Sequence, residues 1–159
     1  MEIIFQIDDP FLKDIDLDLI TQALLNACQH FYQETTKAAT GTITLVITDT
    51  ETVQQLNYQY RDIDAPTDVL SFENRPDPEF PHMNVDHLGD IIIAYPVAKA
   101  QATTAGHTPM EEITLLAVHG LLHLLGFDHD APAAKEKMWR MQGQIMLEMG
   151  LGHVHPTEN

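Results

Sequence analysis

The chain has 159 residues, with 8 lysines and arginines against 24 aspartates and glutamates, and its formal net charge is −16. The one cysteine, Cys28, rules out an internal disulfide, and so acidic a composition excludes a broad basic face for nucleic acid. Because this length is typical of one domain, we expect a single domain over residues 1–159.

Strand and helix patterns alternate in the first half of the chain. Apolar and β-branched runs predict strands over Glu2–Ile7, Thr42–Thr48 and Asp68–Phe72, and helical spacing predicts helices over Asp18–Glu34 and Thr50–Tyr60. The N-terminal stretch has neither a basic region nor a long apolar run, so we expect no signal peptide, no membrane partner and a cytoplasmic location.

The second half opens with residues 74–81, which are rich in proline and acidic residues and are predicted to form a loop. A strand is predicted over Leu88–Ala94, followed by a helix after Pro96, a helix after Thr108 and a last helix over Ala133–Met149. These elements predict an α+β fold, with a small mixed β-sheet of about four strands packed with helices.

The helix after Thr108 has the clearest boundaries. Thr108 can cap its N-terminus, Pro109 suits the first helical position and Glu111 completes a capping box, while Gly126 is a natural stop. The residues between are apolar nearly all the way round, which is typical of a buried helix.

Three histidines lie at the end of this buried helix. His119 and His123 are four residues apart and share one face, and a turn after Gly126 can bring His129 back toward them. Buried imidazoles need partners, either within the core or from a metal that binds both. Three neutral ligands with an open fourth position are typical of a catalytic zinc site, so we expect one Zn²⁺ per chain and a hydrolase.

The residue after His119 argues against a peptidase of the zincin class. Those enzymes carry His-Glu-x-x-His, with the glutamate as general base, whereas this chain has Gly120 at that position. A glycine inside a helix also indicates that backbone or substrate approaches closely there.

The run from His119 to His129 resembles the signature of the YbeY family, single-strand-specific endoribonucleases of ribosomal RNA maturation. Residues 56–72 and 88–93 resemble two further stretches of the family, and the resemblance spans about residues 40–150. This chain departs from the family at Phe127, where tyrosine is usual, and at Glu73, where proline is frequent.

The resemblance implies a zinc-dependent endoribonuclease that matures the 3′ end of 16S ribosomal RNA and takes part in ribosome quality control. It implies that His119, His123 and His129 bind the metal and that Arg61 and His119 are catalytic. Single-stranded ribosomal RNA and the ribosome or its associated proteins are the expected partners, and DNA is not. A zincin-like peptidase or another metal hydrolase, and a non-catalytic ribosome-assembly factor, are the alternatives.

The charge balance makes local cations important for an RNA substrate. Arg61 can hold a phosphate through two hydrogen bonds or form a surface salt bridge, and the resemblance favours the first role. Lys99 and Arg140 are weaker candidates. Asp128 either orients a histidine ligand or helps to form the turn before His129.

The remaining polar and aromatic residues are assigned structural roles. His153 and His155 belong to a terminal segment, and four other histidines are expected on the surface or in loops: His30, His82, His87 and His107. We expect Cys28 in the core and Trp139 as the anchor of the last helix.

Overall fold

The structure is a computed structural model that describes residues 1–74, 78–79 and 86–156. Its strands are β1 (Glu2–Ile7), β2 (Thr42–Thr48), β3 (Val69–Glu73) and β4 (His87–Ala94). Its helices are α1 (Asp9–Leu12), α2 (Leu17–Thr35), α3 (Thr50–Arg61), α4 (Tyr95–Ala105), α5 (Pro109–Leu124) and α6 (Pro132–Glu148). The predicted α+β class is confirmed.

The four strands form one mixed sheet in the order β1-β2-β4-β3. β1 and β4 both pair with β2 in parallel, and β3 pairs with β4 in antiparallel fashion. β3 is therefore an edge strand, and its outer side is open to groups from other elements.

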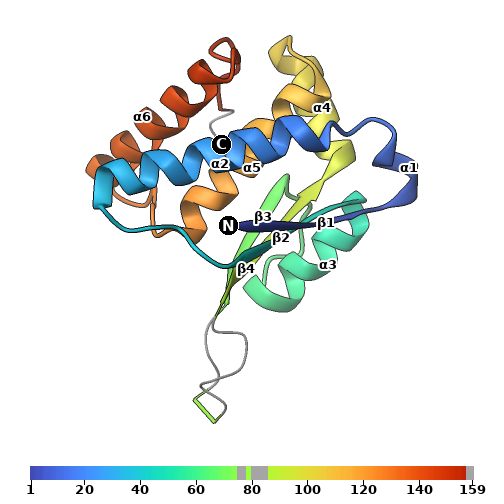
Figure 1. The fold of residues 1–159 in the computed structure, drawn as a ribbon. Coiled ribbons are helices and arrows are strands. Elements are labelled where there is room, and N and C mark those ends of the chain that lie inside the picture. Colours follow the sequence, from blue (N-terminus) through green and yellow to red (C-terminus); the bar gives the residue numbers. More distant parts are fainter. Residues whose placement is uncertain (75–77, 80–85, 157–159) are drawn as a thin grey trace.

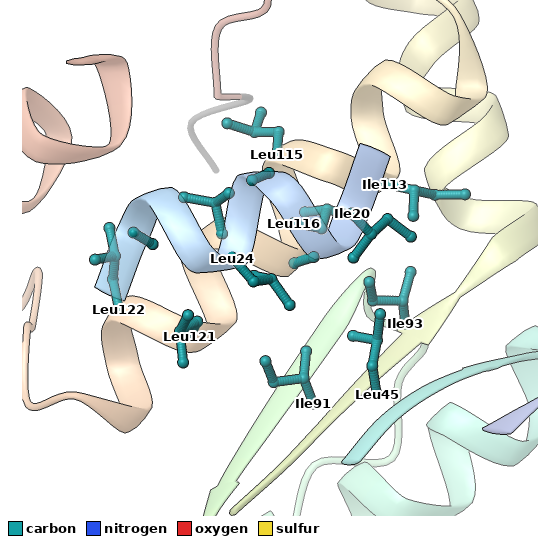
Figure 2. Packing of buried hydrophobic residues seen from close by; sticks show 14 of the residues in the cluster. Ile20, Leu24, Leu45, Ile91, Ile93, Ile113, Leu115, Leu116, Leu121 and Leu122 are labelled. Atoms are coloured by element: carbon teal, nitrogen blue, oxygen red, sulfur yellow. The ribbon is translucent and has the colours of Figure 1, made fainter. Parts of the chain in front are cut away.

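The two faces of the sheet build two apolar clusters. Successive side chains of a strand point to opposite faces, so Ile91 and Ile93 join the larger cluster with α2, α5 and α6, while Ile92 joins the smaller one with Val53 of α3. Figure 1 shows α3 alone on its side of the sheet and α2 and α5 on the other. Figure 2 shows side chains of α2, α5 and the strands meeting in the larger cluster, Leu24, Leu121 and Ile91 among them.

α5 is the central helix of the larger cluster, as its sequence predicts. The capping box is confirmed, since Thr108 accepts from the backbone N–H of Glu111 and the Glu111 side chain accepts from that of Thr108. Eleven of its residues are buried. It therefore lies between the sheet and the outer helices, and its C-terminal end carries the histidines.

Gly120 allows α5 to lie close to the sheet. A Cβ added there would lie 2.8 Å from Cγ2 of Ile91 and 3.0 Å from Oγ of Ser71. The close approach expected at this glycine is thus to side chains of β4 and β3, and helix–sheet packing explains it.

Two differences from the expectations concern local elements. The short helix α1 was not predicted, because four residues carry too little periodicity to be detected. The loop expected over residues 74–81 lies mostly outside the described residues. Within the part of the chain that the structure describes, every helix is too short or too polar to cross a membrane.

Candidate metal centre

The C-terminal end of α5 brings three histidines together. His119 and His123 lie one turn apart on the helix, with Nε2 atoms 3.1 Å from each other. The chain then reverses at Gly126, whose φ of +100° favours a residue without a side chain. After this reversal His129 lies with its ring centroid 5.6 Å from that of His119 and 5.0 Å from that of His123.

Hydrogen bonds fix which ring nitrogens of the two helical histidines carry a proton. Nδ1 of His119 lies 2.9 Å from Oε1 of Gln142, and Nδ1 of His123 lies 3.1 Å from the carbonyl oxygen of Phe127. Because both oxygens only accept, both Nδ1 atoms donate. The Nε2 atoms are left without protons, and their lone pairs are available to a metal.

The same arrangement favours a cation between the rings. Two unprotonated nitrogens 3.1 Å apart repel each other unless a positive charge lies between them. Burial lowers the pKa of His119 to about 4 and also lowers the pKa of His123, so protonation does not supply that charge at neutral pH. Zinc–nitrogen bonds of about 2.0–2.1 Å put two tetrahedral ligands roughly 3.3 Å apart, which fits this pair.

The third histidine completes a set of donors for one ion. One ligand atom from each of His119, His123 and His129 lies within 4.8 Å of the other two. Nitrogen donors of this kind suit zinc and other first-row transition metals. Residues of this chain therefore fit a bound metal, with a side of the site open toward solvent because His129 is exposed.

The histidines form one wall of a cleft of about 790 Å³. The C-terminal end of α3 and the edge strand β3 also line it, including Arg61 and Phe72. Nη2 of Arg61 donates to the carbonyl oxygen of Ser71 at 2.7 Å, and its Cζ lies 5.4 Å from the centroid of the Phe72 ring. The predicted site residue Arg61 thus faces the same cleft as the histidines.

The charges that line this cleft are mostly negative. Arg61 is its one arginine or lysine among the described residues, whereas its acidic residues are Asp68, Glu73, Asp128 and Asp130. Lys99 and Arg140 do not line it. Asp128 acts in the turn, since its Oδ1 accepts from the backbone N–H groups of His129 and Asp130.

Sequence reasoning missed the partners that other elements supply. Gln142 of α6 is 1% exposed, and a polar residue on the buried face of α6, four positions after Met138, was the signal for it. Trp139 does more than anchor α6, since its ring lies 5.5 Å from that of His119 and 5.6 Å from that of His129.

One of the other histidines is buried although it lies in a loop. His107 is in the loop between α4 and α5, as expected, but its side chain is 3% exposed and its Nε2 lies 2.5 Å from Oε2 of Glu112. The turn between α4 and α5 packs this ring inward, which spacing rules do not detect. His30 and His87 pair with Glu148 and Asp90, and His82 lies outside the described residues.

The fold and this site define a small α+β protein with a three-histidine centre of the hydrolase type. A protein of Thermotoga maritima with a known solution structure has the same fold: the TM-score is 0.55 at 20% identity, over 92% of this chain and 90% of that one.

Comparison of sequences identifies the family. The model of the YbeY endoribonuclease family matches residues 6–150. The endoribonuclease YbeY of Desulfitobacterium hafniense is 44% identical over 113 residues, which cover 69% of this chain and 72% of that protein. The YbeY of Moorella thermoacetica is 44% identical over 119 residues, covering 72% and 76%. The chain belongs to the YbeY endoribonuclease family.

Proposed function

We propose that this protein is a metal-dependent endoribonuclease that cleaves single-stranded segments of ribosomal RNA, with one zinc ion held by His119, His123 and His129. The observation that carries the proposal is the pair of unprotonated Nε2 atoms 3.1 Å apart in a family of endoribonucleases. When bound, zinc supplies a Lewis acid that polarises a phosphoryl oxygen and makes water more acidic.

The residues around the zinc site have separable tasks. Gln142 and the carbonyl of Phe127 hold the two helical imidazoles in the tautomer that exposes Nε2. Since the bond to His123 comes from the backbone, phenylalanine in place of the family's usual tyrosine at this position preserves it. One N–H of Arg61 donates to the carbonyl oxygen of Ser71, and its other N–H groups are available to a phosphate in the cleft.

We further propose the substrate and the setting that the family resemblance implies. The RNA is the 3′ end of 16S ribosomal RNA, and cleavage serves maturation and quality control of ribosomes in the cytoplasm. Ribosome-bound delivery suits a chain with a net charge of −16, which attracts free RNA poorly.

The two alternatives differ from the proposal in the role of the metal. A peptidase needs a general base, and Gly120 stands where zincins carry their glutamate. A non-catalytic assembly factor would need the metal for stability, but α5 has its own cap and a buried apolar surface that do not involve the histidines.

The proposal is tested on the full chain with its metal. Elemental analysis is expected to find about one zinc per chain. Single-stranded RNA is expected to be cleaved and a duplex of the same sequence left intact, with activity lost on chelation and restored by zinc. Circular dichroism is expected to change little on chelation. Cleavage that persists without metal contradicts the proposal, and unfolding on chelation supports the assembly factor.

A second experiment tests the role of Arg61 in cleavage. The variant Arg61→Lys keeps the charge but loses the planar fork, so kcat/KM on single-stranded RNA is expected to fall at least about 10-fold with metal content unchanged. The matched control is Arg140→Lys, which changes an exposed arginine outside the cleft. Equal kcat/KM values for Arg61→Lys and Arg140→Lys would show that Arg61 has only a structural role.

A further inference from the structure

Tyr60 is a large aromatic side chain left exposed at the rim of the cleft. It is the residue before the last of α3 and is 62% exposed. Single exposed aromatic residues are common, and Tyr58 on the same helix is 58% exposed. The two differ in position, because Tyr60 lines the metal cleft and Tyr58 does not.

The Tyr60 ring has a defined support. Its centroid lies 5.4 Å from that of Phe72, with 56° between the ring planes. Phe72 also lies under the guanidinium of Arg61, at 5.4 Å. One strand residue therefore contacts both a phosphate-binding candidate and an exposed ring, so that the three side chains form one patch beside the histidines.

The charge of the cleft limits how RNA can be held there. Four carboxylates and one guanidinium line it among the described residues, so attraction of the phosphate backbone is weak. Stacking of a base on an aromatic ring does not depend on net charge and tolerates any sequence. A patch of aromatic rings next to Arg61 can bind a base despite the acidic lining.

We propose that Tyr60 and Phe72 form a stacking platform for one unpaired nucleobase of the RNA, next to the phosphate that Arg61 holds. This inference rests on the proposed function. A base inside an A-form duplex is already stacked and paired, so only an unpaired base can reach the platform. The platform thus gives a physical cause for selection of single strands.

The test measures binding and cleavage with the metal-loaded full chain. Binding uses a fluorescent 2′-O-methyl RNA oligonucleotide, checked on a gel to remain intact, and cleavage uses the same sequence as RNA. Tyr60→Ala is expected to raise Kd about 5- to 100-fold, with a matching rise in KM and a smaller change in kcat. Tyr60→Phe is expected to stay within about twofold of the wild type, because the ring remains.

Tyr58→Ala is the matched control, since it removes an equally exposed tyrosine of α3 outside the cleft. A single abasic nucleotide, moved along the oligonucleotide, is expected to weaken binding to the wild type at one position and to have no further effect on Tyr60→Ala. Equal Kd values for Tyr60→Ala and Tyr58→Ala overturn the platform, as does an abasic penalty that persists in Tyr60→Ala.

The result separates this inference from the function on which it rests. If the wild type cleaves RNA and both tyrosine variants bind alike, the platform fails and the endoribonuclease stands. If the wild type cleaves no RNA but Tyr60→Ala still loses binding, the endoribonuclease fails and the platform stands as an RNA-binding surface.

Discussion

Two pairs of side chains that contain histidine lie at opposite ends of α5 and differ in what their nitrogens face. At the N-terminal end, Nε2 of His107 lies 2.5 Å from Oε2 of Glu112, with the two side chains 3% and 1% exposed. At the C-terminal end, Nε2 of His119 lies 3.1 Å from Nε2 of His123. Both pairs are polar groups in apolar surroundings, and both need a partner there.

The difference shows what distinguishes a structural pair from a binding site, namely whether the protein itself supplies a donor for each acceptor. The first pair joins a donor to an acceptor, so the protein satisfies it alone. In the second pair the Nδ1–H groups donate to Gln142 and Phe127, so both Nε2 atoms are acceptors, and a cation from outside can satisfy them. Metal loss and loss of stability should therefore follow from different substitutions.

The largest effect is expected from His123→Ala. Metal content should fall from about one equivalent per chain to near zero, and RNA cleavage should fall about 100-fold or more. The free energy of unfolding of the metal-free protein should change little, because removing one of two repelling acceptors offsets the lost hydrogen bond to the Phe127 carbonyl. Elemental analysis and urea denaturation check both. Metal content near that of the wild type would refute the assignment.

Gln142→Leu tests whether Gln142 holds His119 in the tautomer that exposes Nε2. Without its acceptor, His119 loses the bond that holds its Nε2 toward the metal, so affinity is expected to fall about 10- to 100-fold. Competition with a chromophoric chelator measures the change. Gln144→Leu is the matched control because Gln144 is exposed on the same helix. Unchanged affinity in Gln142→Leu would mean that Trp139 and the helix alone orient the ring.

The structural pair is tested by His107→Ala. The variant should keep its metal but lose about 1–3 kcal/mol of the free energy of unfolding, because Glu112 stays buried without its partner. His153→Ala is the control, since it removes a histidine that is 59% exposed and pairs with Glu111. Metal loss in His107→Ala would show that the two ends of α5 are coupled.

The smallest effect concerns pH. Burial raises the pKa of Glu112 above its ordinary value of 4.5, although the hydrogen bond from His107 opposes the shift. A raised carboxyl pKa contributes stability below the unfolded value and loses it as pH rises through the folded one. From pH 4.5 upward, the wild type should therefore lose stability relative to Glu112→Gln. Denaturation of both proteins across this range measures the difference, and a relative gain by the wild type would contradict it.

Local patterns were sufficient to predict α5 and two of its histidines. Its cap, its stop and its apolar surface depend on residues close together in the sequence. A spacing of four residues puts His119 and His123 on one face of the helix whatever that helix packs against. The same rules placed His107 on the surface or in a loop, where it does lie, but they did not detect that its side chain is buried. The burial of its side chain depends on how the turn after α4 packs, which cannot be predicted from the periodicity of the sequence.

By itself, the sequence determined the strands and long helices to within a few residues, the buried helix and the three histidines at its end, because each of these depends on neighbours a few positions apart. Only the tertiary structure decided which other side chains meet them. Arg61 and Tyr60 reach the cleft because β3 is the edge strand beside α5, and Gln142 does so because α6 packs on α5. The physical reason is that such contacts depend on the order of strands and the packing of whole helices, which are properties of the chain as a whole.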